Sequence, residues 1–183
     1  MHADIYVWRH ARPEDLRAIH ALQRTSLEGL GGGFYSPAQL GAALDNLPLV
    51  SAELIGEGHF FVLETAGRAI AGCGGWSGQP PAYARYDASG QTALPRALVR
   101  SVFVCPHHAR RGFGRWMMGR IERDAAEAGV TTLHLTATLS GVPLYRSLGW
   151  QDGEATALTF PNGVQFPVLN MSKRIAEKLR QAA

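Results

Sequence analysis

The pattern of apolar and polar residues in the first third of the chain predicts a strand followed by two helices. β-Branched and aromatic residues at 5–9 indicate a strand. Proline and two acidic residues at 12–15 suit a helix start, and the apolar residues that follow at helical spacing end before three glycines at 31–33. The segment 36–39, Ser-Pro-Ala-Gln, has the residues of a capping box with proline at the first helical position. We expect this second helix to end before Pro48.

The middle of the chain predicts a hairpin, a long loop, and then the strongest strand and helix signals. Apolar runs at 59–64 and 69–76 flank a polar turn with glycine, as in an antiparallel hairpin. Residues 78–91 lack periodicity and predict a long loop, of the kind that shapes a substrate pocket. A β-branched run at 97–106 predicts a strand, and apolar residues at helical spacing predict a helix over 112–128.

The last third predicts a strand at 132–138, a short helix over 142–148 and a final hairpin that turns at 161–163. Strands and helices are therefore mixed along the whole chain, which indicates an α/β (α+β) class. No internal repeat or low-complexity segment interrupts the order, so we expect a single domain over residues 1–183.

Composition narrows the class of protein. A chain of 183 residues buries roughly 70% of its unfolded surface, so it needs neither disulfides nor a structural metal, and Cys73 and Cys105 are expected to be reduced thiols. No apolar stretch has the length of a membrane span and the N-terminus lacks signal-peptide features, so we expect a cytoplasmic protein without membrane partners. A net charge of +3 is too small to indicate nucleic-acid binding, although it permits an anionic ligand.

The turn between the strongest strand and the strongest helix carries the chemistry. It reads Pro-His-His-Ala-Arg-Arg-Gly-Phe-Gly-Arg over 106–115, directly at a helix N-terminus. Unpaired N–H groups in the first helical turn attract phosphate, and glycines let the backbone approach it closely. A glycine pair also allows close strand-helix packing. A dinucleotide fingerprint is excluded, because Met117 stands where its third glycine is required.

This segment resembles motif A of the GNAT superfamily, the acetyl-CoA-dependent N-acetyltransferases. The match consists of an apolar strand end with proline, 102–106, followed by Ala-Arg-Arg-Gly-Phe-Gly at 109–114. The segment 144–150, Leu-Tyr-Arg-Ser-Leu-Gly-Trp, is similar to a second family element. The resemblance implies the GNAT fold: a central mixed, mostly antiparallel sheet of about seven strands with about four helices, whose splayed central strands form the acyl-CoA cleft.

The resemblance also implies which residues bind acetyl-CoA, the expected cosubstrate. The strand residues would offer main-chain groups to the pantetheine arm, and the turn would offer N–H groups to the pyrophosphate. Ala109 replaces the usual Arg or Gln, and Thr138 replaces an asparagine at the end of the next strand, so the side-chain contacts at these two positions are in doubt. Neither change affects the main-chain N–H groups of the turn, which form the backbone cradle for the pyrophosphate. The implied cofactor-binding residues are Val102, Phe103, Val104, Ala109, Arg110, Arg111, Gly112, Phe113, Gly114, Arg115 and Thr138.

Tyr145 matches the family tyrosine that donates a proton to the leaving thiolate, so the resemblance implies that it is the catalytic acid; the other interpretation is a buried structural tyrosine. No carboxylate lies at 98–101, where the family often has its base. His107, His108 and His134 are more typical of loop and sheet positions, so we assign no base, and proton removal through ordered water stays open.

Arg100 stands out as a charge inside an apolar strand, where it either pairs with an acid such as Glu64 or faces a wet cleft and holds a substrate carboxylate. Trp76 and Tyr35, with Phe34, are candidate aromatic walls for the acceptor.

We therefore expect an N-acetyltransferase that acts on a primary amine of a small molecule through direct attack and a tetrahedral intermediate, with no metal. The alternatives are a non-catalytic acyl-CoA-binding module and a protein acetyltransferase acting on lysine or an N-terminus. Dimerisation through the C-terminal strands is common in such folds, so a homodimer is also considered.

Overall fold

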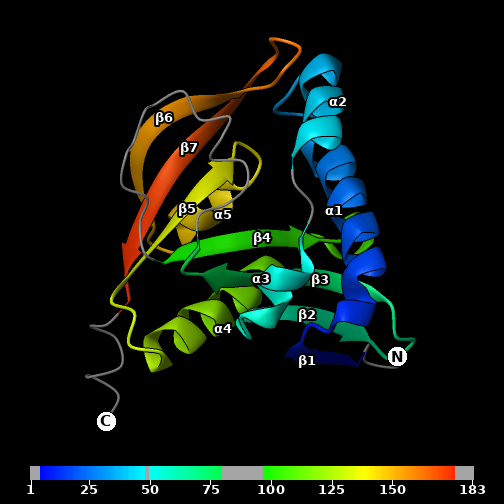
Figure 1. The fold of residues 1–183 in the computed structure, drawn as a ribbon, viewed down its shortest axis with the longest axis vertical. Coiled ribbons are helices and arrows are strands. Elements are labelled where there is room, and N and C mark those ends of the chain that lie inside the picture. Colours follow the sequence, from blue (N-terminus) through cyan, green and yellow to red (C-terminus); the bar gives the residue numbers. More distant parts are fainter. Residues whose placement is uncertain (1–4, 48–49, 80–96, 176–183) are drawn as a thin grey trace.

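The centre of the protein is a mixed sheet, seen in a computed structural model that describes residues 5–47, 50–79 and 97–175 (Figure 1). Within these residues seven strands lie in the order β1-β2-β3-β4-β5-β7-β6. The strands are β1 (Tyr6–His10), β2 (Phe60–Thr65), β3 (Ile70–Ser77), β4 (Leu98–Val104), β5 (Thr132–Thr138), β6 (Gln151–Thr159) and β7 (Gln165–Arg174). The helices are α1 (Leu16–Gly31), α2 (Pro37–Asn46), α3 (Ala52–Gly56), α4 (Phe113–Glu127) and α5 (Val142–Ser147), with 3-10 turns at Pro13–Asp15 and Pro106–His108.

The expected class and element order are confirmed, with one addition. The capping box at α2 is present, since the Ser36 hydroxyl accepts a hydrogen bond from the N–H of Gln39. The short helix α3 was not expected, and it brings the described helices to five rather than about four. It is too short for apolar periodicity to reveal it. The long loop expected at 78–91 falls almost entirely outside the described residues.

Helices α1 and α4 cover opposite faces of the sheet. Strand residues alternate between faces. On β2, Val62 packs with Ile19 of α1, whereas the next residue, Leu63, packs with Met117 of α4. A third cluster lies between α2 and the β6-β7 hairpin, where Ala43 packs with Phe166. The sheet is thus sandwiched at β2–β4 and extended by a hairpin that α2 covers (Figure 1).

Strands β4 and β5 diverge after their first residues. Within the described sheet, β4 and β5 are the two neighbouring strands that run parallel to each other. They share one pair of facing residues, Leu98 with His134. The His134 N–H donates to the Ala97 carbonyl at 3.0 Å. Beyond this point β5 follows β7, with which it pairs from Thr132 to Thr138. An opening between the ends of β4 and β5 is therefore built into the sheet, and the splayed strands expected from the sequence are present.

Two glycine substitutions separate steric demand from helix propensity. A Cβ at Gly75 would lie 2.2 Å from the His59 carbonyl oxygen and 2.7 Å from Phe60 Cα, whereas one at Gly41 meets nothing within 4 Å. We expect Gly75→Ala to lower the free energy of unfolding by about 3 kcal/mol, because backbone atoms must move. Gly41→Ala, at an exposed position in α2, should raise it by about 0.5–1 kcal/mol. Urea unfolding of both variants checks this, and equal effects would contradict the steric account.

Candidate active site

A bulge in β4 shapes one wall of the opening. The register passes from Gly75 opposite Arg100 to Cys73 opposite Phe103, so β4 carries one extra residue. Within this bulge Ser101 has a φ of 51°, a left-handed backbone conformation that is uncommon for residues other than glycine. Its carbonyl accepts a hydrogen bond from the Cys73 thiol at 3.4 Å. Burial raises the pKa of that thiol to about 12, so Cys73 stays protonated and supports the bulge.

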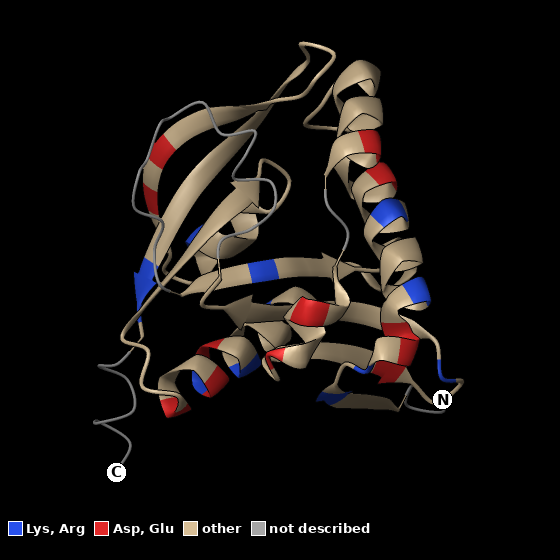
Figure 2. Cartoon of the chain, in the orientation of Figure 1, with Lys and Arg blue, Asp and Glu red and all other residues tan. Residues whose placement is uncertain are grey.

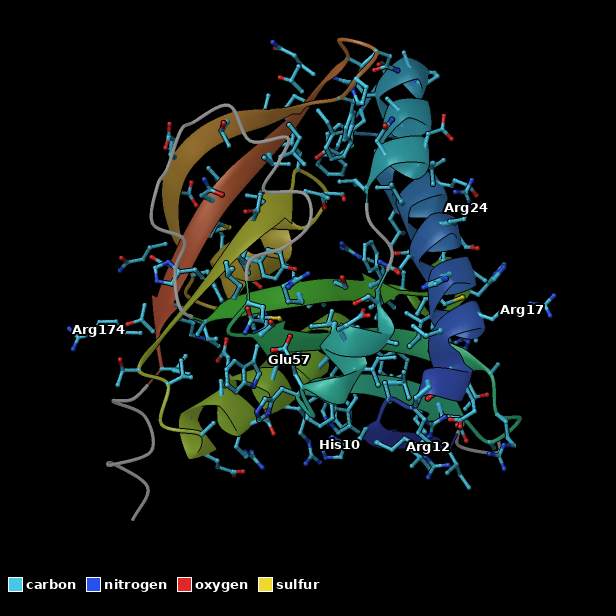
Figure 3. All side chains as sticks on the ribbon, in the orientation of Figure 1. His10, Arg12, Arg17, Arg24, Glu57 and Arg174 are labelled. Carbon is cyan, nitrogen blue, oxygen red and sulfur yellow. The ribbon has the colours of Figure 1, made fainter. Side chains whose placement is uncertain are left out.

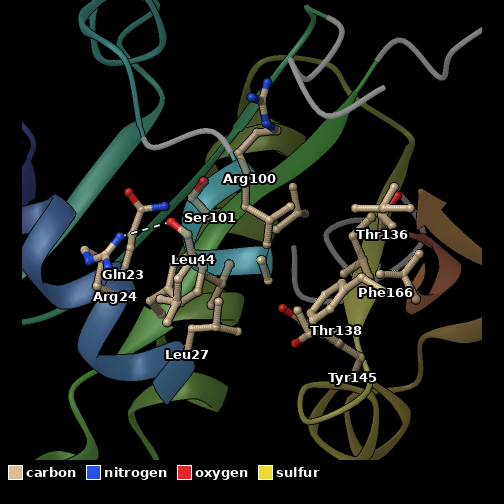
Figure 4. Close-up of a pocket in the computed structure, with 18 residues that line it drawn as sticks. Gln23, Arg24, Leu27, Leu44, Arg100, Ser101, Thr136, Thr138, Tyr145 and Phe166 are labelled. Atoms are coloured by element: carbon tan, nitrogen blue, oxygen red, sulfur yellow. Dashed lines mark hydrogen bonds between the residues drawn. The ribbon is translucent and has the colours of Figure 1, made fainter. Parts of the chain in front are cut away.

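A cavity of about 130 Å³ lies between the diverging strands and the helices α1 and α2 (Figure 4). In the close-up, Leu27 and Leu44 face Thr136, Phe166 and Tyr145 across the hollow. Most of the wall is apolar. The described lining residues are Gln23, Arg24, Leu27, Ala43, Leu44, Leu47, Val99, Arg100, Ser101, Val102, Phe103, Leu135, Thr136, Thr138, Tyr145, Leu158, Phe166 and Val168.

The turn between β4 and α4 has the backbone of an anion site. Arg110 and Gly112 both have positive φ, 64° and 86°, and α4 begins at Phe113. The Trp116 N–H donates to the Gly112 carbonyl, so the N–H groups of the three residues before Trp116 precede the first hydrogen bond of the helix. A Cβ at Gly112 meets nothing within 4 Å, so the space beside this turn is open. The positive end of the helix dipole adds to this attraction for an anion.

Contacts from β1 and α1 hold this turn in place. The Tyr6 hydroxyl lies 3.1 Å from His108 Nδ1, and Arg111 Nη1 donates to it at 3.4 Å. The Tyr6 ring packs on Phe113 with centroids 4.5 Å apart. On the other side Pro106 lies against Gly29 of α1, where a Cβ would come within 2.7 Å of Pro106 Cγ. Sequence reasoning missed Tyr6, because its contacts join residues 102 positions apart.

Tyr145 and Thr138 meet at the same cavity. Tyr145 is buried, and its ring lies edge-on to Trp150 with centroids 5.9 Å apart. A Cβ at Gly141 would come within 2.9 Å of the Tyr145 ring, so the glycine gives the ring its room. The Thr138 hydroxyl lies 3.1 Å from that of Ser140. The structure therefore brings Tyr145 together with Val102, Phe103 and Thr138 at one cavity.

Trp76 and Tyr35, expected as acceptor walls, are placed elsewhere. Trp76 is buried in the core, and its Nε1 donates to Asp124 at 2.7 Å. The Tyr35 hydroxyl donates to the Pro167 carbonyl at 2.9 Å and accepts from the Leu139 N–H at 2.7 Å. Burial raises the pKa of Tyr35 to about 12, so its hydroxyl remains a donor. Neither is among the described residues that line the cavity, where Phe103, Tyr145 and Phe166 are the aromatic side chains.

Arg100 lies at the edge of the cavity. Figure 2 shows one basic band on β4, and Arg100 is the single Lys or Arg in that strand. Its Nη1 donates to the Gln79 carbonyl at 3.4 Å. Glu64, one acid that the sequence offered as a partner, is bound by Arg9, whose Nε donates to it at 2.9 Å. Of the alternatives open for Arg100, pairing with Glu64 is therefore not the arrangement found among the described residues.

The described part of the cavity wall contains no Asp or Glu. Of the histidines considered as bases, His108 contacts Tyr6 at the turn. His134 lies on β5 and is not among the described lining residues, and burial lowers its pKa. Across the described ranges no group of three or more His, Cys, Asp or Glu side chains is placed to hold a metal, and no helix has the length and apolar character needed to cross a membrane.

Comparisons with known proteins identify this architecture. The sequence model of the "Acetyltransferase (GNAT) domain" family matches residues 56–152, more than half of the chain. The chain belongs to this family, and it is an acyltransferase for which acetyl-CoA is the expected cosubstrate. No curated protein sequence matches it.

Several solved structures share the fold at low sequence identity. A GCN5-related N-acetyltransferase from Rhodopseudomonas palustris is 18% identical with a TM-score of 0.69, over 92% of this chain and 94% of that one. The PaiA N-acetyltransferase of Thermoplasma acidophilum, in complex with coenzyme A, is 14% identical with a TM-score of 0.65, over 93% and 99%. YncA from Salmonella typhimurium, with acetyl-CoA, is 16% identical with a TM-score of 0.61, over 94% and 95%.

We expect the Tyr6 hydroxyl to support cofactor binding through the turn. Tyr6→Phe keeps the ring packing but removes the contacts to His108 and Arg111, so the Kd for CoA should rise about 3-fold to 10-fold, the loss of one hydrogen bond. Calorimetric titration with CoA measures this.

Tyr35→Phe is the matched control, because it also deletes a hydroxyl with two partners but lies away from the turn. It should lower the Tm and leave the CoA Kd unchanged. If both variants changed the Kd equally, or if Tyr6→Phe left it unaltered, the supporting role of Tyr6 would be wrong.

Proposed function

We propose that the protein transfers the acetyl group of acetyl-CoA to the primary amine of a small molecule. The observation that carries this proposal is the cavity beside the β4-β5 opening, which is about 130 Å³ in volume and is closed on one side by α1 and α2. A pocket of this size suits a small acceptor, whereas a peptide requires an extended groove. Tyr145 lines the same cavity, so the acceptor amine and the proton donor share one space.

The acyl donor would be held mainly by backbone groups. The N–H groups of Phe113, Gly114 and Arg115 at the start of α4 suit the pyrophosphate. Gly112 precedes them in the left-handed conformation, as the N-cap residue of the helix. The bulged segment Val102–Val104 suits the pantetheine arm, beside which β5 has diverged. Ala109, Arg110, Arg111 and Thr138 complete the proposed contacts.

The proposed chemistry is direct transfer. The neutral amine nitrogen attacks the thioester carbonyl, the carbon-sulfur bond breaks, and the thiolate takes a proton from the Tyr145 hydroxyl. A main-chain N–H near Val104 would stabilise the oxyanion. Since the described wall of the cavity has no carboxylate, we propose that the amine loses its proton through ordered water. Thiol release from acetyl-CoA, measured with small amines and with peptides, tests the proposal: turnover of peptides alone would contradict it.

A pair of variants at Gly114 tests the backbone cradle. A Cβ there meets only the end of the Leu144 side chain, at 2.8 Å, in both Gly114→Ala and Gly114→Pro. Proline is tolerated in the first helical turn but has no N–H. We expect Gly114→Pro to weaken CoA binding by at least about 10-fold, the loss of a charge-assisted hydrogen bond. Gly114→Ala should bind CoA nearly as well as the wild type. Equal Kd values for the two variants would remove Gly114 from the cradle.

The acid role of Tyr145 has a separate test. Tyr145→Phe keeps the ring that packs on Trp150 and removes the proton donor. We expect kcat to fall about 10²-fold, the low end for acid-base catalysis, because a thiolate is a good leaving group. The Kd for acetyl-CoA and the Tm should change little. An unchanged kcat would make Tyr145 a structural residue.

A further inference from the structure

One part of the cavity is lined by apolar side chains from α1, α2 and the β6-β7 hairpin. The side chains that define this apolar subsite are Leu27, Leu44, Leu158, Phe166 and Val168. We propose that the acceptor amine carries a branched aliphatic or aryl group, which fills the apolar subsite and determines which amines are acetylated. This inference rests on the proposed function and deepens it by naming the class of acceptor.

The apolar subsite is built by elements that the proposed acyl donor does not contact. Leu27 and Leu44 come from α1 and α2, and in Figure 4 they face Phe166 of β7 across the hollow. The proposed contacts to the acyl donor come instead from β4, the turn before α4, the start of α4 and the end of β5. Because an acetyl group carries only a methyl beyond its carbonyl carbon, we assign the apolar subsite to the acceptor rather than to the acyl chain.

The wall of the apolar subsite is held rigidly from behind. The Phe166 ring stacks on the Tyr35 ring with centroids 4.1 Å apart. The Tyr35 hydroxyl is fixed in turn by the Pro167 carbonyl and the Leu139 N–H. Ala43 of α2 belongs to the same packed cluster as Phe166. A preformed wall needs no reordering when a ligand binds, so it distinguishes acceptors by their shape and their apolar area.

Two of the polar side chains that line the cavity are already engaged by other parts of the protein. The Gln23 Oε1 accepts a hydrogen bond from the Val50 N–H at 3.0 Å. The Thr136 hydroxyl donates to Asn170 Oδ1 at 2.8 Å. A polar end group placed against the leucine and phenylalanine side chains would give up its hydrogen bonds to water for apolar surroundings, which is unfavourable. The apolar subsite therefore favours an apolar end group.

The two arginines among the described lining residues leave the centre of the hollow apolar. Arg24 extends from α1 (Figure 3), and its Nη1 donates to the Leu44 carbonyl at 3.0 Å, the contact dashed in Figure 4. The Arg100 guanidinium points away from the hollow in the same view. An aliphatic or aryl group that enters the hollow thus leaves water without displacing a charge, and its binding is favoured in proportion to the apolar area buried.

The volume of the cavity limits the size of the group. It is about 130 Å³. A cavity of about 150 Å³ lined by Leu, Ile and Phe accommodates benzene. A branched aliphatic chain or a single aromatic ring is therefore the largest group that we expect the acceptor to place there.

Three amines separate the size of the end group from its polarity. 3-Methylbutylamine ends in an isopropyl group, 3-aminopropanamide has a carboxamide of the same shape in its place, and ethylamine lacks it. With saturating acetyl-CoA, we expect kcat/KM for 3-methylbutylamine to exceed that for each of the others by at least about 10-fold, as apolar pockets discriminate. The amide withdraws electrons and makes its amine less basic, so a larger neutral fraction of the amine cannot explain this preference.

Two asparagine variants in α2 assign the preference to the apolar subsite. Leu44→Asn places a polar group in its wall and should lower the kcat/KM ratio of 3-methylbutylamine to 3-aminopropanamide by at least about 5-fold. Leu40, one turn earlier in α2, packs on the same apolar cluster but is not among the described lining residues, so Leu40→Asn should keep the wild-type ratio. The ratio does not depend on the fraction of folded protein, so partial misfolding cannot imitate this result.

Filling the apolar subsite gives a second test, which needs no turnover. In the presence of CoA, the product N-(3-methylbutyl)acetamide should bind at least about 10-fold more tightly than N-ethylacetamide, as measured by calorimetry. Leu44→Trp should abolish this difference, because the larger side chain occupies the space of the isopropyl group. Equal Kd values for the two products with the wild-type protein would overturn the inference.

The outcomes distinguish this inference from the proposed function. Acetyl transfer to 3-aminopropanamide or ethylamine at a kcat/KM equal to or above that for 3-methylbutylamine would overturn the acceptor class and leave the proposed function standing. An equal loss of preference in the Leu40 and Leu44 variants would overturn it as well. Hexanoyl-CoA used faster than acetyl-CoA by the wild type but not by Leu44→Trp would assign the apolar subsite to the acyl chain instead. Failure to bind CoA and to acetylate any amine would contradict the proposed function itself.

Discussion

The structure depends on the fact that β4 and β5 share a single parallel pair, Leu98 with His134, within the described sheet. Each strand is held on its other side by an antiparallel ladder, β4 by β3 and β5 by β7. Because those ladders twist apart, the two central strands separate instead of closing the sheet. The separation gives an extended ligand access to the main chain of β4 and to the cavity beside it. The acyl-donor site that we propose thus depends on an interruption in backbone pairing.

The two ends of the site are supported by different parts of the molecule, and α1 contributes to both. At the turn before α4, Gly29 of α1 packs on Pro106, and Tyr6 of β1 contacts His108. At the cavity, Leu27 of α1 forms part of the wall that faces β7. A shift of α1 would therefore move the turn before α4 and the cavity together. In the proposed function, this one helix would couple the positions of the two substrates.

Local signals predicted the fold and the element boundaries of the turn before α4. The capping box at Ser36 and the glycine at 112 act through neighbouring residues, so short sequence patterns reveal them. The bulge at Ser101 could not be predicted, because it depends on register with β3 and uses a residue that disfavours positive φ. Trp76 and Tyr35 were assigned to the acceptor on residue type alone. Their hydrogen bonds to Asp124 and Pro167 are long-range contacts that only the fold reveals.

A crystal structure of the protein with CoA would test the central claim, that the interrupted pairing of β4 and β5 creates the acyl-donor site. We predict that the pantetheine arm lies between β4 and β5 and hydrogen-bonds the main chain of Val102–Val104, with the pyrophosphate at the N–H groups of Gly112–Arg115. CoA bound elsewhere would contradict this account. So would β4 and β5 closing into a continuous ladder with the phosphates away from the start of α4.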